Sequence, residues 1–320
     1  MTQILELRVK AMRALGGDAL GVELQADEQA LLPAFNAGAH IELQLGNGLR
    51  RCYSLLNAQD ERRRYVVGVS RAPASRGGSR FIHEELRVGH RVLASAPRNN
   101  FPLTEDALAT VLIAGGVGVT PIWCMVQRLE ALQRPWRLYY AARTRAQAPL
   151  LDRLEKLAKS SACGALTVNF DHEADGRPWR IDELIAQQNR AAHLYCCGPA
   201  PMLAAFETAT RDWPAKQVHL ERFTAAGLAD KSAAFSVRLV RSGRTVNVAE
   251  GQSILDAVLA AGVDAPYSCL EGVCGTCETR VLAGAPEHHC AVLSAAERAE
   301  GRSMMICCSR SRGGALELDL

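Results

Sequence analysis

The sequence predicts a chain of three domains: an antiparallel β-barrel, an α/β domain built on a parallel sheet, and a smaller C-terminal α+β domain. Three observations predict it. Residues 1–104 alternate short apolar strands with turns, residues 105–225 alternate strands with helices, and residues 233–320 carry a close group of cysteines. A length of 320 residues leaves room for two or three domains, each with its own core.

The first domain is predicted from short apolar strands with little helical pattern between them. Ile4–Val9, His40–Leu45 and Tyr65–Val69 are such strands, and Gly, Pro and Asn residues separate them. This patterning over about a hundred residues is typical of a small antiparallel barrel.

The second domain is predicted from a change of rhythm after residue 105. Short apolar runs now alternate with helical stretches, which indicates a parallel sheet with helices on both faces. The runs are Val111–Ala114, Leu138–Ala141, Leu166–Phe170, His193–Cys196 and Gln217–Leu220. Residues 226–232 are predicted to be a linker, and residues 233–320 begin with a hairpin around Ser242–Gly243 and a helix over Ser253–Ala261 closed by Gly262.

The cysteines near the C-terminus follow the plant-type [2Fe–2S] spacing C-x4-C-x2-C…C with Cys269, Cys274, Cys277 and a later Cys307. A structural zinc site is the alternative, but zinc ligands usually form two short pairs, whereas three of these cysteines share one nine-residue loop. Cys308 stands beside Cys307, so spacing alone leaves the fourth ligand open. The motif predicts a one-electron iron–sulfur centre.

Composition favours a reduced, cytoplasmic protein without nucleic-acid or membrane partners. The eleven cysteines are an odd number in a long chain that shows no signal segment, so we expect ligands and buried thiols rather than disulfides. No apolar run approaches the ~18 residues of a membrane span. A net charge of +3 gives no reason to expect nucleic acid.

Two small-residue turns are predicted at one edge of the parallel sheet. Gly115, Gly116 and Gly118 lie between a strand and a helix that begins near Pro121, where backbone amides can approach a pyrophosphate. Cys197-Gly198-Pro199 follows a later strand, at the edge where open α/β sheets bind ligands. Tight packing alone would also explain such turns, and Cys197 alone could be a packed thiol.

In the barrel, Arg51, Tyr53 and Ser54 together with the turn Arg76-Gly77-Gly78-Ser79 could supply a flavin with an aromatic wall, donors and a phosphate site. An ordinary barrel strand would contain the same residue types, so the residues by themselves leave the flavin open.

Taken in order, these signatures (R-x-Y-S, R-G-G-S, G-G-x-G-x-T-P, Y-C-C-G-P and the cysteine motif) resemble those of the phthalate dioxygenase reductase family over essentially the whole chain. The resemblance implies that the C-terminal domain is a plant-type ferredoxin (β-grasp) domain and that Cys307 is the fourth ligand. It implies an NADH site at Gly115, Gly116, Gly118, Cys197, Gly198 and Pro199. It also implies an FMN site, with FAD as the alternative, at Arg51, Tyr53, Ser54, Leu55, Gly77, Gly78 and Ser79, with Thr120 and Phe223 near the ring.

Asp171 is expected to contact the ribose of the nucleotide. A carboxylate there suits NADH, because it accepts a hydrogen bond from a 2′-hydroxyl and repels a 2′-phosphate. Arg143 and Arg145 also follow a strand and could instead recruit that phosphate.

The resemblance implies the reductase component of a two-component Rieske-type oxygenase system, a monomer that passes electrons from NADH to a terminal oxygenase acting on an aromatic acid. Ser54 is expected beside flavin N5, Cys197 in the nicotinamide pocket and Phe223 over the flavin. A flavin suits the middle position, since NADH gives two electrons together and the cluster takes one. A cytochrome P450 or diiron hydroxylase as acceptor, or a non-catalytic redox sensor, are the alternatives.

Two features bear on the partner. The segment Glu287-His288-His289-Cys290 stands where the family has an Asp-His-Arg-Asp run, and it is expected to border the surface on which the oxygenase docks. Residues 232–320 hold 8 basic and 10 acidic residues, against 29 and 24 in the rest of the chain, which favours docking to a basic surface.

Overall fold

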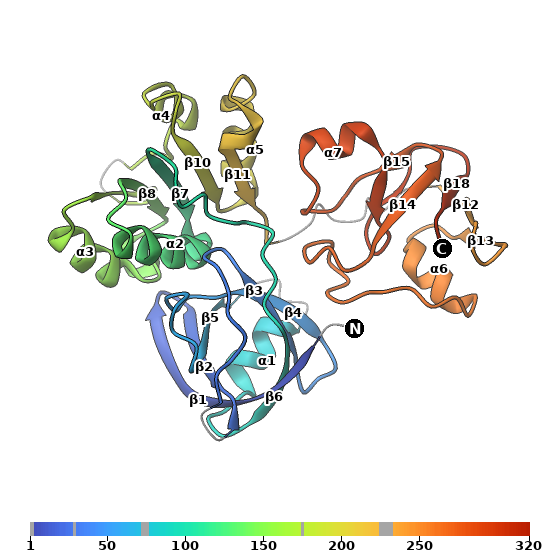
Figure 1. Ribbon diagram of the computed structural model, residues 1–320, viewed down its shortest axis with the longest axis horizontal. Helices are drawn as coiled ribbons and strands as arrows, with labels where there is room; N and C mark the ends of the chain where they lie inside the picture. Colours follow the sequence, from blue (N-terminus) through green and yellow to red (C-terminus); the bar gives the residue numbers. More distant parts are fainter. Residues whose placement is uncertain (1–2, 28–29, 72–76, 174–175, 224–232) are drawn as a thin grey trace. The chain divides into compact units, whose positions relative to one another are not determined.

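The computed structural model describes residues 3–27, 30–71, 77–173, 176–223 and 233–320 (Figure 1). The chain forms two compact units, Met1–Glu221 and Arg222–Leu320. The predicted linker, residues 226–232, and Arg76 of the predicted phosphate turn lie outside the described residues. Within the described part of the chain, no helix is both long enough and apolar enough to cross a bilayer.

The first unit begins with a six-stranded antiparallel sheet in the order β4-β3-β6-β1-β2-β5. Alternate residues such as Leu7 and Val9 on β1 point inward and are buried, because successive side chains of a strand face opposite sides. One short helix lies beside the sheet. The elements are β1 (Ile4–Gly16), β2 (Ala19–Gln25), β3 (His40–Gln44), β4 (Arg50–Ser54), β5 (Tyr65–Ser70), α1 (Gly78–Glu84) and β6 (Arg91–Ser95).

A five-stranded parallel sheet follows in the order β11-β10-β7-β8-β9. On β7, Leu112 faces one apolar cluster and Ile113 the other, so helices cover both faces and every residue of the strand is buried. The elements are β7 (Thr110–Gly115), η2 (Gly116–Gly118), α2 (Val119–Ala131), β8 (Trp136–Ala142), η3 (Arg145–Gln147), α3 (Leu151–Ser160), β9 (Gly164–Phe170), α4 (Ile181–Ala186), β10 (His193–Cys197), α5 (Ala200–Ala209), η4 (Ala215–Gln217) and β11 (Val218–Glu221).

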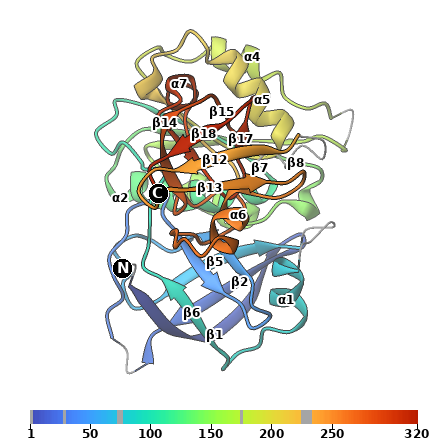
Figure 2. The ribbon, with the colours of Figure 1, turned by 90° about the vertical axis from the view of Figure 1, so that its right-hand side faces the viewer.

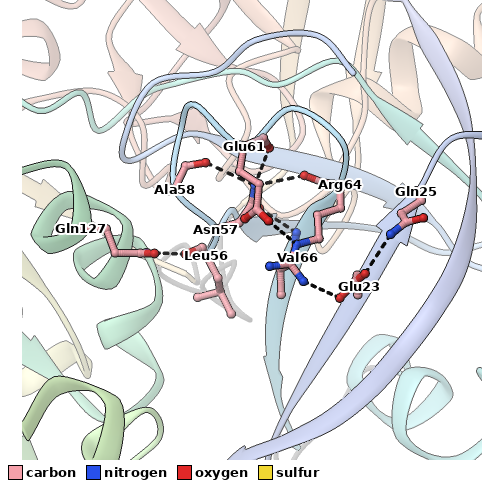
Figure 3. A network of polar contacts seen from close by, with 9 residues as sticks. All are labelled: Glu23, Gln25, Leu56, Asn57, Ala58, Glu61, Arg64, Val66 and Gln127. Carbon is pink, nitrogen blue, oxygen red and sulfur yellow. Dashed lines mark hydrogen bonds and ion pairs between the residues drawn. The ribbon is translucent and has the colours of Figure 1, made fainter. Parts of the chain in front are cut away.

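The barrel and the parallel sheet share one apolar core, which explains why they form a single unit. Asn57 closes the loop after β4: its amide donates to the carbonyls of Glu61 and Arg64 at 3.0 Å, and its oxygen accepts from the Val66 amide at 2.9 Å (Figure 3). Gln127 on α2 donates to the Leu56 carbonyl at 2.7 Å. These bonds fix the end of β4, and with it Ser54, against the nucleotide half.

The second unit holds the mixed sheet β13-β12-β18-β14-β16, a small two-stranded sheet and two helices. The hairpin around Ser242–Gly243 and the helix after Ser253 form as predicted, and a capping box between Ser253 and Asp256 starts that helix. The elements are β12 (Phe235–Leu239), β13 (Arg244–Val248), α6 (Ile254–Ala260), β14 (Glu278–Ala283), β15 (Pro286–Glu287), α7 (Ala295–Glu300), β16 (Ser303–Met305), β17 (Arg310–Ser311) and β18 (Leu316–Leu318). The observed architecture confirms the predicted fold class.

Candidate active site and iron–sulfur centre

The two predicted small-residue turns lie against each other at the carboxyl edge of the parallel sheet. β7 and β10 are neighbours, with Ala114 opposite Cys197, at the point where the strand order reverses. A Cβ on Gly118 would lie 2.2 Å from the carbonyl oxygen of Cys197, and one on Gly115 would lie 2.5 Å from Cδ of Pro199. Only glycine fits at these two positions.

Gly116 differs from its neighbours. Its φ is +52°, and a Cβ there would meet no atom within 4 Å. The backbone at Gly116 therefore borders open space at the switch point of the sheet, which is where doubly wound sheets bind nucleotides. The turns thus form a cradle that fits a dinucleotide.

Ser54 and Cys197 approach the same place from the barrel and from the sheet. Ser54 is buried at the end of β4, and its hydroxyl donates to a carboxyl oxygen of Glu221 over 3.5 Å. Glu221 ends β11 directly opposite Cys197 on β10. The structure therefore gathers a hydroxyl, a thiol and a carboxyl at the junction of the two halves of the unit.

Glu221 was missed by the sequence reasoning. Although part of the residue is exposed, burial raises the pKa of its carboxyl to about 8, and the Ser54 hydroxyl only partly opposes that shift. Burial also raises the pKa of Cys197, and the Glu221 charge acts in the same direction. At neutral pH both groups hold their protons. The sequence signal was a carboxylate ending an otherwise apolar strand, Val218–Glu221.

On the barrel side, Arg51 lies against the predicted phosphate turn, because a Cβ on Gly78 would come within 2.8 Å of its Cγ. Gly77 has a φ of +95°, which favours glycine, and Ser79 follows in α1. Tyr53 is half-buried beside them on β4. Leu55, in contrast, is fully buried in the barrel core, so its side chain does not reach a ligand.

Thr120 connects the two halves rather than facing open space. Its side chain is buried, its hydroxyl donates to the Val117 carbonyl at 2.9 Å, and its methyl would lie 2.8 Å from a Cβ on Gly68 of β5. Phe223 is 38% exposed and belongs to the second unit, after β11.

Asp171 follows β9 at the carboxyl edge, where Asn169 donates to its carboxylate at 2.7 Å. Of the two competing arginines, Arg145 is occupied by a paired contact with Glu155 at 2.7 and 3.2 Å and stacks on Phe170. Arg143 is exposed; its backbone carbonyl accepts from the His172 amide at 2.9 Å, and no contact of its guanidinium is found among the described residues.

In the second unit, the four cysteines of the motif are buried and lie as two pairs. Contact with the Cys274 thiol and then burial raise the pKa of Cys269, and contact with Cys307 and then burial raise that of Cys277. The thiol of Cys308 also contacts that of Cys307, and it lies 3.7 Å from the Met305 carbonyl. Two facing pairs suit two irons that share bridging sulfides.

The surroundings of these thiols also fit a [2Fe–2S] cluster. The amide of Glu271 donates to the Cys269 sulfur at 3.3 Å, and the Thr276 hydroxyl oxygen lies 3.3 Å from the Cys274 sulfur. The buried Ser268 hydroxyl has no partner in the described structure and can serve a cluster atom. Four buried thiolate donors in two pairs, with a backbone amide and hydroxyls beside them, suit a binuclear cluster.

Two family models match the chain. Residues 237–312 match the 2Fe-2S iron-sulfur cluster binding domain, and residues 112–208 match the oxidoreductase NAD-binding domain.

Curated and solved proteins match over nearly the full length. The chain is 48% identical over 317 residues to phenoxybenzoate dioxygenase subunit beta of Ectopseudomonas oleovorans, covering 99% of this chain and 97% of that protein. The crystal structure of phthalate dioxygenase reductase matches with a TM-score of 0.75 and 35% identity, covering 99% and 98% of the two chains. An intact type IV self-sufficient cytochrome P450 monooxygenase matches with a TM-score of 0.84 and 36% identity, covering 99% of this chain and 41% of that one.

Proposed function

The chain belongs to the phthalate dioxygenase reductase family of oxygenase reductases, and we propose that the oxygenase it serves is of the Rieske type and acts on an aromatic acid. As a member of that family it is an NADH-dependent iron–sulfur oxidoreductase with NAD-binding and [2Fe–2S] domains. One observation carries the proposal: a nucleotide cradle and two facing cysteine pairs occur in the same chain. Residues 1–104 would bind the flavin, residues 105–225 would bind NADH, and residues 233–320 would hold the cluster.

NADH would lie in the cradle, with its pyrophosphate over the amides of Gly116 and Gly118 and its nicotinamide beside Cys197. The tight contact between the turns supports this placement, because it holds the backbone amides in one fixed arrangement. Asp171 would accept from the ribose hydroxyl. The capture of Arg145 by Glu155 supports NADH over NADPH, since it removes one of the two candidate phosphate ligands.

FMN would lie on the barrel side, with its phosphate at Arg51 and the turn Gly77–Ser79 and its ring beside Ser54. When bound, the flavin supplies a group that accepts two electrons together and releases them singly, and the cluster supplies a one-electron carrier. Leu55 and Thr120 would act by shaping the wall behind the ring, because both side chains are committed to packing.

The chain's own residues have a positioning and proton-holding role. Ser54 donates to Glu221, and the protonated carboxyl at neutral pH keeps negative charge away from the place where a hydride would pass. The buried thiol of Cys197 offers an uncharged, polarisable surface to the nicotinamide. The site thus works by orientation and exclusion of charge more than by acid–base catalysis.

Cys269, Cys274, Cys277 and Cys307 would hold the cluster, each pair binding one iron. The contact of Cys307 with Cys277, and of Cys308 with the Met305 carbonyl, supports Cys307 as the fourth ligand. Since the pKa values of Cys269, Cys277 and Cys307 are raised, these thiols are protonated before metal arrives, and assembly of the cluster would release protons. The eleven free cysteines also support a cytoplasmic, reducing location, and we propose a monomer.

A cytochrome P450 is a second candidate acceptor, because one structure that matches almost the whole chain is part of a self-sufficient P450 monooxygenase. The two candidates differ in which purified acceptor they reduce. Reconstituting NADH oxidation with a Rieske-type oxygenase and, separately, with a P450 would distinguish them.

The electron path is tested by Cys274→Ser. This change should abolish reduction of cytochrome c and of the oxygenase by removing a cluster ligand, whereas NADH-to-ferricyanide activity should stay largely intact because it needs only the first unit. Cys308→Ser is the matched control, since we assign Cys308 no iron and its thiol lies 3.7 Å from the Met305 carbonyl. Equal loss of both activities in Cys274→Ser would contradict a linear path.

A further inference from the structure

A cationic pocket in the second unit lies outside the electron path described so far. It is a cavity of about 410 Å³ lined by Glu287, His288, His289, Arg298 and Arg312. Glu287 ends β15 and the two histidines follow it, Arg298 lies on α7, and Arg312 follows β17, which pairs with β15. Figures 1 and 2 both show α7 close to β15. Two arginines and one glutamate give the pocket a formal charge of +1, with the histidines not counted.

The pocket contains hydrogen-bond donors without partners. Both ring nitrogens of His288 and Nε2 of His289 are buried and have no side-chain hydrogen-bond partner among the described residues. The Arg298 backbone approaches the His288 ring, and Nε2 of His289 lies 3.6 Å from Glu287. The Arg312 guanidinium likewise has no hydrogen bond or ion pair among the described residues. Buried polar groups usually have partners, so the histidine nitrogens, with the exposed Arg312 guanidinium beside them, point to a ligand for this pocket.

The ligand that suits these groups is a carboxylate. A guanidinium with an open edge binds a carboxylate through two parallel bonds, and a neutral imidazole adds one further donor. Burial, followed by the charge of Arg298, lowers the pKa of His288, which keeps its ring neutral at pH 7. Arg298 is also fixed in place, because it donates to the carbonyls of Leu293 at 3.0 Å and Cys290 at 2.6 Å.

The pocket is directly connected to the cluster loop. The amide of Ala291, one residue beyond the segment that lines the pocket, donates to the carbonyl of Gly272 at 2.7 Å. On the same loop, Leu270 is 55% exposed and Tyr267 is 41% exposed. Exposed apolar side chains at the place where electrons leave, with a polar pocket beside them, are typical of a protein docking surface rather than a site for a free ion.

We propose that this pocket receives the carboxylate of an acidic side chain on the terminal oxygenase and thereby sets the register of docking over the cluster loop. The inference rests on the proposed function. Residues 232–320 have a net charge of −2. The pocket is therefore a local positive site within an acidic domain, and it would select one acidic group of the partner.

The test uses Arg312→Gln and Arg312→Glu in the full holoprotein, with the oxygenase that the wild-type chain reduces fastest. Loss of a charged hydrogen-bond partner should raise KM for the oxygenase roughly tenfold with Gln, and further with Glu. Arg302→Gln and Arg302→Glu are the matched controls, because Arg302 is 83% exposed and does not line the pocket. Inorganic phosphate, at ionic strength held constant with chloride, should raise KM in the wild type but not in Arg312→Gln.

Activity with cytochrome c serves as an internal reference, since a basic acceptor is not attracted to a cationic pocket. An unchanged oxygenase KM in both Arg312 variants would overturn the inference, and so would an equal rise in the Arg302 variants. A phosphate effect that disappears in Arg312→Gln while KM stays constant would show a free-anion site only and would also overturn it. Failure of the wild type to reduce any oxygenase would instead count against the proposed function.

Discussion

The contact between the two nucleotide turns can be tested by placing a single methyl group between them. Gly118 has an ordinary φ of −60°, so alanine is acceptable to the backbone there. The obstacle is steric, because the new Cβ would lie 2.2 Å from the Cys197 carbonyl oxygen and 2.5 Å from its carbon. Ordinary contact begins at 3.4 Å, so the turns must separate by about 1.2 Å, the difference of the two distances.

This separation sets the expected magnitudes for Gly118→Ala. A misplacement of about 1 Å can cost on the order of 10²-fold in rate, so NADH should reduce the bound flavin about a hundred times more slowly. Overpacking in a core costs about 1–3 kcal/mol of unfolding free energy, which corresponds to a fall in Tm of roughly 2–12 °C for a unit of this size.

The assay is anaerobic stopped-flow reduction of the flavin at saturating NADH, with Tm measured on the same samples. Gly21→Ala is the control. Its new Cβ would meet the flexible Leu15 side chain at 2.9 Å, away from the turns, so the rate of flavin reduction should equal that of wild type. A Gly118→Ala protein that reacts within about twofold of wild type and keeps its Tm would refute the argument that these turns are in direct contact.

Three further predictions follow from the same structure. First, the pKa of Glu221 is about 8 in the folded chain against an ordinary 4.5, so the folded state holds a proton that the unfolded state has lost. The free energy of unfolding should therefore fall as pH rises from about 4.5 to about 8, by no more than about 1.4 kcal/mol per pH unit. Glu221→Gln should flatten this part of a Tm-against-pH profile, and an unchanged slope would exclude Glu221 as its source. Second, Asp171→Asn should shift the ratio of kcat/KM for NADPH to that for NADH upward by roughly tenfold, measured by steady-state ferricyanide reduction, and a constant ratio would remove Asp171 from the ribose site. Third, removing iron with a chelator should lower the melting temperature of the Arg222–Leu320 unit while the Met1–Glu221 unit keeps its own transition, as followed by circular dichroism and limited proteolysis; a single unchanged transition would argue against a structural role for the cluster.

The sequence alone determined those features whose chemistry is local in the chain. Cys269, Cys274 and Cys277 fall within nine residues, so their spacing alone indicates a cluster loop. The glycines from Gly115 to Gly118 sit between a strand and a helix and predict a phosphate turn for the same reason. The alternation of strands and helices was enough to predict the parallel sheet and its ligand-binding edge.

Only the tertiary structure decided which distant groups meet. Glu221 lies 167 residues from Ser54, and no periodicity could show that the barrel and the last strand of the sheet bring them together. The burial of Leu55 and the ion pair between Arg145 and Glu155 depend in the same way on packing between elements. The pocket around His288 and Arg312 joins two strands and a helix, and its unpaired donors arise from folding. Spacing along the chain fixes which chemical groups are available, whereas burial and long-range contacts fix their protonation and their partners.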